Sequence, residues 1–259
     1  MAEIILYDLA CTKNVCFSPV VWRIRLILNY KQVPYRTVFL EFPDIEPTLK
    51  ALYDIHPNTS NRPYTHTPQL TRPRGIAPTE GPQSKYTVPA IHHIPSNKHI
   101  MDSGSIAEFL ESTYPNPPLP LTSALGQDIL SKSRSVIGPA FQVSILPREI
   151  HILSPRAQEY FRRTREASLG HSLEDQLKEE TEAWVAVDSR LGELEELIRT
   201  RGNDGPFVLG SLPSYADFTI AGSLQSARMV DERVFDRLGR IVGLKNIYEA
   251  CSPLMERNN

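Results

Sequence analysis

The chain has 259 residues, of which 41% are hydrophobic and 22% charged, and this composition predicts a packed globular fold rather than extensive disorder. At this length we expect two domains. The formal net charge of -2 argues against a nucleic acid as the main partner, because proteins that bind the phosphate backbone carry a marked basic excess.

The cysteines and the apolar runs indicate the compartment. Cys11, Cys16 and Cys251 form no CxxC pair, and their odd number is unlike a secreted disulfide framework. The N-terminus lacks the basic and apolar segments of a signal peptide, and no run approaches the ~18 apolar residues that a membrane span requires. We therefore expect a cytoplasmic protein with no membrane partner.

The first elements predicted are a strand, a helix and a second strand. Residues 3–8 and 37–41 are short apolar runs, each of a length typical of a buried strand. Between them Ser18 occupies the position of a helix N-cap, and Pro19 the first helical position, where its missing N–H costs nothing. The apolar face of this helix is predicted to carry Val20, Val21, Ile24, Ile27 and Leu28, and the other faces Arg23, Arg25, Asn29 and Lys31.

A proline-rich stretch follows the second strand. Eight of the 22 prolines lie between Pro43 and Thr87, and the apolar periodicity fades after Tyr53. We interpret residues 57–86 as a long loop. A loop of this size is usually a disordered insertion, a lid or a binding loop, and the sequence leaves these alternatives open.

A hairpin and a helix are predicted next. Residues 87–93 and 98–101 read as two strands joined by a turn. Ser105 stands three residues before Glu108, which is the spacing of a capping box at the start of a helix.

Everything after residues 115–120, sequence PNPPLP, reads as helical. The clearest helix is expected over residues 173–199, where apolar side chains recur every three or four residues. Ser214 and Asp217 form a second capping-box pattern ahead of another helix.

This order of elements resembles the glutathione transferase superfamily. Ser18-Pro19 stands where that superfamily keeps its catalytic region, Val88-Pro89 resembles its cis-proline strand, and Asp102-Ser103 resembles its glutathione-anchoring pair. The segments SPVVWRIRLILNYKQVPY, EFPDIEP and YFRRTREASLGHSLED further resemble the fungal transferases related to bacterial lignin β-aryl etherases.

The resemblance implies a fold and a set of partners. The fold class would be a thioredoxin-like α/β domain over residues 1–116, carrying the insertion 57–86, followed by an all-helical domain over residues 122–259. Glutathione would be the cosubstrate, a hydrophobic small-molecule electrophile would be the acceptor, and the protein would form a homodimer. A role as a lid or partner surface is our hypothesis for the insertion.

The resemblance also implies site residues. Ser18 would be catalytic; Val88 would pair with the cysteinyl backbone of glutathione beside Pro89; Ser103 would bind the γ-glutamyl carboxylate and Asp102 the ammonium group. The acceptor pocket would be formed by residues 124–170, with Phe141, Ile145 and Phe161 as candidate contacts that are equally consistent with core packing.

The chemistry of a serine hydroxyl fits such a role. Without a visible base Ser18 is a poor nucleophile, but it can donate a hydrogen bond that favours the thiolate form of glutathione. The helix N-terminus behind it adds positive potential. From the residues alone, a simple helix-capping role for Ser18 stays open, because serine is a leading N-cap residue.

Other readings are weaker or remain alternatives. Cys16 as a redox thiol lies two residues early, no G-x-S-x-G elbow supports a serine hydrolase, and we expect no metal at His92, His93 and His99. A non-catalytic glutathione carrier or regulator, and a tailoring enzyme of fungal secondary metabolism that forms C–S bonds or isomerises its substrate, remain alternatives to a conjugating or ether-cleaving transferase.

Overall fold

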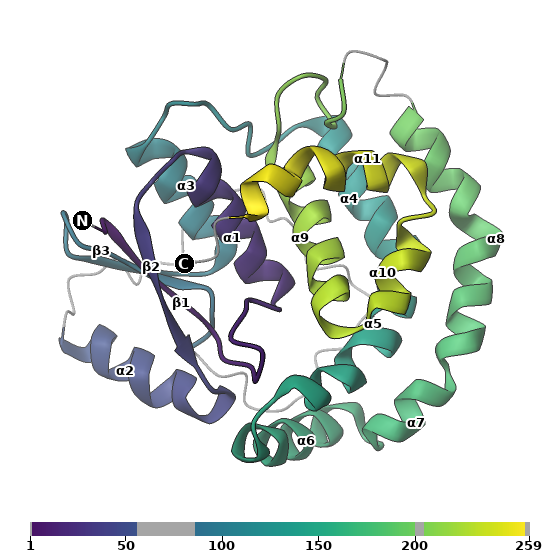
Figure 1. The fold of residues 1–259 in the computed structure, drawn as a ribbon, viewed down its shortest axis with the longest axis horizontal. Coiled ribbons are helices and arrows are strands. Elements are labelled where there is room, and N and C mark those ends of the chain that lie inside the picture. Colours follow the sequence, from purple (N-terminus) through teal and green to yellow (C-terminus); the bar gives the residue numbers. More distant parts are fainter. Residues whose placement is uncertain (1, 56–85, 200–204, 257–259) are drawn as a thin grey trace.

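The computed structural model describes residues 2–55, 86–199 and 205–256. A four-stranded mixed sheet forms the N-terminal part, and helices form the rest (Figure 1). This is a thioredoxin-like α/β unit followed by an all-α region, as the sequence predicts. The N-terminal elements are β1 (Ile4–Leu9), α1 (Pro19–Tyr30), β2 (Tyr35–Leu40), the 3-10 helix η1 (Phe42–Asp44), α2 (Ile45–Ile55), β3 (Ala90–His93), β4 (Lys98–Met101) and α3 (Ser103–Thr113).

The sheet has the order β2-β1-β3-β4, with β1 parallel to β2 and antiparallel to β3. Strand β1 is buried along its whole length, because both faces of the sheet are covered. Ile4 and Leu6 share a core with α1 and α3, whereas Ile5 and Tyr7 pack with Leu49 of α2 on the opposite face.

Helix α2 is missing from the sequence prediction. The sequence places Pro43 and Pro47 in a proline-rich stretch and predicts no element there, yet proline is tolerated in a first helical turn, and Pro47 lies in the first turn of α2. The spacing of Ile45, Leu49 and Leu52, all of which pack in one cluster, is the signal that was available. The predicted loop over residues 57–86 lies outside the described residues except for Tyr86, which is buried.

The described C-terminal elements are helical, apart from an isolated bridge between Phe207 and Gly210. They are α4 (Ala124–Val136), α5 (Gly138–Ile145), the 3-10 helix η2 (Leu146–Ile152), α6 (Pro155–Leu169), α7 (Leu173–Lys178), α8 (Glu180–Arg199), α9 (Tyr215–Val230), α10 (Glu232–Leu238), α11 (Val242–Cys251) and the 3-10 helix η3 (Ser252–Met255). The single helix predicted over residues 173–199 is thus two, with the break at Glu179.

Helix α9 lies at the centre of the helical region and packs against α1 (Figure 1). Its start is the predicted capping box: the Asp217 carboxylate accepts from the Ser214 backbone N–H at 2.8 Å and from the Ser214 hydroxyl at 2.6 Å. Close approach to α1 requires a glycine, since a Cβ at Gly222 would stand 2.9 Å from the Pro19 carbonyl oxygen.

The residues predicted outside the apolar face of α1 are largely buried. Arg25, Asn29 and Lys31 are all buried, because the sheet, α3 and the C-terminal end of the helical region cover the other faces of α1. Each finds a partner: Arg25 pairs with Asp8, Asn29 donates to the Leu254 carbonyl oxygen at 2.6 Å, and Lys31 pairs with Glu111 at 2.6 Å.

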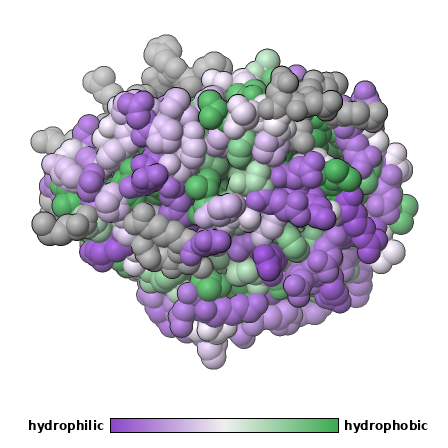
Figure 2. All heavy atoms as spheres, turned by 45° about the horizontal axis from the view of Figure 1, so that its top comes forward, coloured by the Kyte–Doolittle hydropathy of each residue, from purple (hydrophilic) through white to green (hydrophobic). Residues whose placement is uncertain are grey.

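The face turned forward in Figure 2 is mainly hydrophilic, and hydrophobic side chains show there as small separate groups. None of the helices in the described residues is both long and apolar enough to cross a bilayer.

Candidate active site

Ser18 lies at the N-terminus of α1, as predicted. The residue is 5% exposed, and its hydroxyl oxygen accepts a hydrogen bond of 3.4 Å from the Val21 backbone N–H. A hydroxyl that accepts this bond still has its own proton to donate. The first turn of α1 contains no acidic residue that would offset the positive potential of the helix N-terminus.

Side chains of α1 hold the segment that leads into Ser18. The Trp22 indole N–H donates to the Cys16 carbonyl oxygen at 2.9 Å, and the Arg25 guanidinium pairs with the Asp8 carboxylate at 2.9 Å. Both side chains of that ion pair are fully buried. Residues on β1 and α1 therefore fix the turn between them.

Cys16 does not behave as a redox thiol in this setting. It is fully buried, and burial, together with the negative charge of Asp8, raises its pKa well above the usual range. A thiol that stays protonated is a poor nucleophile. The redox interpretation of Cys16 is therefore not supported.

The loop between β1 and α1 is also anchored to the helical region. Thr12 donates from its N–H to the Ile152 carbonyl oxygen at 2.8 Å, and the Lys13 ammonium group donates to the Met229 carbonyl oxygen at 2.7 Å. Phe17 packs in one cluster with Ile152. The position of Ser18 thus depends on η2 and on the end of α9.

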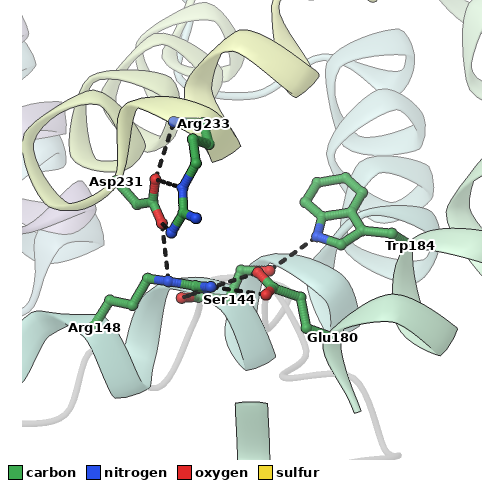
Figure 3. Close-up of polar contacts among 6 residues, drawn as sticks. All are labelled: Ser144, Arg148, Glu180, Trp184, Asp231 and Arg233. Carbon is green, nitrogen blue, oxygen red and sulfur yellow. Dashed lines mark hydrogen bonds and ion pairs between the residues drawn. The ribbon is translucent and has the colours of Figure 1, made fainter. Parts of the chain in front are cut away.

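A charged network fixes η2 in turn (Figure 3). Arg148 makes two hydrogen bonds to Glu180 at 2.6 and 2.7 Å, and an ion pair of 2.9 Å with Asp231, which lies between α9 and α10. The Trp184 indole N–H donates to the Ser144 hydroxyl at 2.9 Å. An open hollow of about 290 Å³ lies beside these groups, but its lining comes from η2, α8 and α10 and includes no residue of α1 or α3.

Val88 and Pro89 precede β3, and the peptide bond between them is cis, as the sequence analysis expects. The last pair of the β1–β3 ladder is Tyr7 with Ala90, so the Val88 backbone lies beyond that ladder. Val88 is half-buried and packs in the cluster that contains Phe17, the neighbour of Ser18.

Asp102 and Ser103 form the start of α3. Asp102 is the N-cap, and its carboxylate accepts from the backbone N–H groups of Gly104 at 2.9 Å and Ser105 at 3.1 Å. The predicted capping box of Ser105 with Glu108 is therefore wrong, because the N-cap of α3 is Asp102, three residues before Ser105. Asp102 has a φ of 74°, a value that costs free energy for a residue with a Cβ and that often marks a functional position.

The start of α3 leaves donors for a ligand. The N–H groups of Gly104 and Ser105 bond the Asp102 carboxylate, and that of Ile106 bonds the Asp102 carbonyl oxygen. Within the described part of the chain the Ser103 N–H makes no such bond. Ser103 thus has both a backbone and a hydroxyl donor available.

Arg23 links α1 to this helix. Its guanidinium donates to the Ser103 hydroxyl oxygen at 3.3 Å and to the Tyr215 hydroxyl oxygen at 2.9 Å. Arg23 lies about 7.5 Å along the helix axis from Ser18, given a rise of 1.5 Å per residue. A tripeptide of ~3.3 Å per residue can span such a distance.

The three acceptor candidates are not brought together. Ile145 is 2% exposed and belongs to the main core, which Phe141 also contacts, whereas Phe161 is fully buried in the cluster around Phe17. Phe161 packs against Phe42 with a ring-centroid distance of 5.3 Å. In η2, burial raises the pKa of Glu149 to about 7, and the charge of Arg165, which lies over the Phe161 ring, opposes that shift.

His92 and His93 of the hairpin form hydrogen bonds to neighbouring side chains. His92 bonds the Asn97 side chain at 3.0 Å, and His93 bonds the Ser96 and Tyr114 hydroxyls at 2.6 and 3.0 Å. No cluster of three potential metal ligands occurs among the residues that the structure describes.

Sequence reasoning missed two residues of this region, Asp8 and Arg23. The sequence predicts Asp8 only as the end of a strand, and Arg23 only as a residue outside the apolar face of the first helix. A charged residue directly beside strictly apolar positions was the available signal in both cases.

Comparisons with known proteins agree with this arrangement. Residues 17–113 match the family model of the glutathione S-transferase N-terminal domain, and residues 127–246 match that of the C-terminal domain. A glutathione S-transferase-like protein of Aspergillus flavus, ustS, is 33% identical over 231 residues, which cover 83% of this chain and 75% of that protein.

Solved structures of fungal proteins share the fold. A glutathione S-transferase of Ceriporiopsis subvermispora in complex with glutathione superposes with a TM-score of 0.77 and 29% identity, over 97% of both chains. The glutathione transferase GSTFuA3 of Phanerochaete chrysosporium also gives a TM-score of 0.77, with 26% identity over 98% of both chains.

Proposed function

The chain belongs to the glutathione S-transferase family, and from this premise we propose that it binds glutathione and activates its thiol for attack on a hydrophobic electrophile. The observation that carries the proposal is the Ser18 hydroxyl, which is buried at the N-terminus of α1 with its proton still available. The similar Ceriporiopsis subvermispora structure, which contains glutathione, supports the choice of cosubstrate.

The role of Ser18 is to stabilise a thiolate. The thiol of a cysteinyl residue has an ordinary pKa of about 8.5 and is mostly protonated at neutral pH. A hydrogen bond donated by Ser18 favours the charged sulfur, and the N-terminus of α1 adds positive potential. The turn between β1 and α1, which Trp22 and Arg25 hold, keeps the Ser18 hydroxyl in place before glutathione binds.

The remaining contacts to glutathione come from the segment before β3 and from the start of α3. The Val88 backbone, beside Pro89, pairs with the cysteinyl residue as an added strand would. The N–H and hydroxyl groups of Ser103 bind the γ-glutamyl carboxylate at the N-terminus of α3. The Asp102 carboxylate uses one oxygen for capping, which leaves the other for the ammonium group.

The reaction forms one carbon–sulfur bond. The thiol proton passes to solvent when glutathione binds, and the sulfur then donates an electron pair to an electrophilic carbon. The leaving group, an aryloxide or a halide, departs with the electrons of the bond that breaks; this covers both conjugation and ether cleavage. The acceptor lies in the region of residues 124–170, and Phe141, as the only half-buried member of the three candidates, is the contact we retain there.

The architecture of the whole molecule is part of the proposal. We assign glutathione binding to a domain that ends near residue 116 and acceptor binding to the helices after residue 122. A homodimer, and a role of residues 57–86 in acceptor selection, stay predictions that gel filtration with light scattering and a deletion variant would test.

Calorimetry in two buffers of different ionisation enthalpy tests the proposed function. The difference in heat between the buffers reports how many protons leave when glutathione binds. Tight binding with release of a substantial fraction of a proton supports thiolate formation. Binding without release would favour a carrier or regulator, and no binding would overturn the proposal. If glutathione binds, turnover is measured with a panel of electrophiles. Glutathione that is regenerated at the end of the reaction would favour an isomerase over a conjugating enzyme.

A further inference from the structure

Glu149, on η2, carries a carboxyl group that no contact within the described chain explains. The residue is half-buried, and its carboxyl group forms no hydrogen bond with any residue that the structure describes. The fully buried side-chain atoms without a partner in the described chain do not include its oxygens, so solvent still reaches them. An acidic group in such surroundings requires an explanation, and a ligand that it meets would supply one.

The position of Glu149 on η2 directs it toward the proposed reaction centre. In a 3-10 helix, side chains three residues apart lie on the same face, so Glu149 shares its face with Leu146 and Ile152. Both of these pack in the cluster that contains Phe17, the residue before Ser18. Glu149 therefore lies on the side of η2 that packs against the approach to the sulfur-binding hydroxyl.

Arg165, on α6, is the charge that acts on Glu149. Its guanidinium lies over the rings of Phe42 and Phe161, at 5.6 and 5.1 Å from their centroids, and pairs with no carboxylate among the described residues. Burial raises the pKa of Glu149 to about 7, and the charge of Arg165 limits that rise. At neutral pH a large fraction of Glu149 is thus protonated and can transfer a proton.

The other cationic groups on η2 and on the elements packed against it already bond oxygen atoms of the chain. Helix α5 carries no charged residue, and His151 of η2 is exposed. The cations that bond carboxylate, carbonyl or hydroxyl oxygens are Arg148, Arg162, Lys178, Lys13 and Arg228. Burial and Arg165 therefore control whether Glu149 is protonated.

We propose that Glu149 is a catalytic acid of the transferase, whose proton goes to the acceptor oxygen that the glutathione sulfur displaces. The inference rests on the proposed function and decides between its two leaving groups. An acid assists a basic aryloxide to leave, whereas a halide leaves as a stable anion, so Glu149 favours aryl ethers as acceptors.

The step balances in atoms and charge. The sulfur forms a bond to the acceptor carbon, and the carbon–oxygen bond breaks with its electron pair on oxygen. Glu149 protonates that oxygen, so a neutral phenol leaves. Solvent returns a proton to Glu149, which balances the proton that the thiol releases when glutathione binds.

The test compares two acceptors with the same electrophilic carbon, phenacyl phenyl ether and phenacyl chloride, after subtraction of the uncatalysed rates. In Glu149→Gln, which keeps the shape but has no transferable proton, kcat/KM for the ether relative to the chloride should fall by ~100-fold. Glu159→Gln is the matched control, because it makes the same change at an exposed residue of α6, and the ratio should stay as in the unmodified protein. A folded Glu149→Gln variant with an unchanged ratio would overturn the inference.

The pH dependence is a second measurement, and it needs no change at Glu149. For the ether, kcat/KM should fall as the pH rises above about 7, where Glu149 loses its proton, and the chloride should show no such fall. Arg165→Met removes the charge that lowers the pKa of Glu149, so the fall should move to higher pH, whereas Arg165→Lys should leave it in place. A fall shared by the chloride, or one that does not move in Arg165→Met, would refute the role of Glu149.

The two proposals can fail separately. If the unmodified protein converts neither acceptor in the presence of glutathione, the proposed function is wrong and the inference falls with it. If the protein converts the chloride and does not cleave the ether, the proposed function stands and only the role of Glu149 is refuted.

Discussion

Replacing Ser18 by alanine should raise the pKa of bound glutathione. Ser18 as a residue is only 5% exposed, so the bond that its hydroxyl donates to sulfur forms in surroundings of low dielectric, where hydrogen bonds are stronger than in water. A charge-assisted hydrogen bond is worth about 1.5–3 kcal/mol. Since about 1.4 kcal/mol corresponds to one pKa unit, the expected rise is about one to two units.

The same substitution should cost little stability. The bond that Ser18 accepts from the Val21 N–H is long, at 3.4 Å, and places this cap at the weak end of the usual range, about 0.5–1 kcal/mol. Helix α1 is mainly held by its buried side chains. The folded protein can therefore be titrated.

The assay is the ultraviolet absorbance of the thiolate, followed against pH with glutathione bound. Ser123→Ala is the matched control, because Ser123 caps α4 through a 3.0 Å bond to the Gly126 N–H and lies in the helical region. The control should lose at least as much stability, because its capping bond is shorter, and should leave the titration unchanged. A bound thiol that titrates at the same pH in Ser18→Ala and in the unmodified protein would refute the role assigned to Ser18.

Three further substitutions test the packing around the site. Gly222→Ala should destabilise the protein by about 1–3 kcal/mol in urea denaturation, because its Cβ would stand 2.9 Å from the Pro19 carbonyl oxygen. Glu149→Gln should change the pH dependence of stability: its folded pKa of about 7 exceeds the ordinary 4.5, so the folded state binds more protons and stability falls as pH rises through that window. In Glu149→Gln the urea midpoint should therefore fall less than in the unmodified protein as the pH rises from 4.5 to about 7. Arg148→Met should cost about 1.5–3 kcal/mol, since it removes two short charge-assisted hydrogen bonds to the partly buried Glu180 carboxylate.

Matched controls exist for these variants. At Gly192, in α8, an added Cβ would meet nothing within 4 Å, so Gly192→Ala should be neutral or stabilising. Lys132→Met breaks an ion pair whose side chains are 34% and 47% exposed, and exposed pairs contribute about 0–1 kcal/mol. Equal losses in Arg148→Met and Lys132→Met, or in the two glycine variants, would show that the packing argument is wrong. An unchanged pH profile in Glu149→Gln would contradict the assignment of its pKa.

The sequence predicted correctly those helix and strand boundaries that are set by neighbouring residues. Ser18 with Pro19 marks the start of α1, and Ser214 with Asp217 marks the start of α9, because each cap involves residues within one helical turn. The second strand of the hairpin, Lys98–Met101, has the predicted bounds. The cis bond before Pro89 was expected from family resemblance, not from local propensity, which favours the trans form.

Local signals failed where a competing local choice was close in energy. Asp102 and Ser105 both suit an N-cap, and the structure uses Asp102, which adopts a φ of 74° to do so. The prolines near α2 left residues 45–55 without a predicted helix, yet burial of Leu49 against the sheet favours one.

The tertiary structure alone decided which charges are buried and what they face. By helical spacing Arg23 and Arg25 both lie outside the apolar face of α1. In the structure Arg23 meets Ser103 of α3 and Tyr215 of α9, whereas Arg25 is buried against the sheet and pairs with Asp8 of β1. The Arg23–Ser103 contact joins residues 80 positions apart. Helical periodicity describes which residues share a face, whereas the partner of that face is set by packing of distant segments, and the free energy of a buried charge depends on that partner.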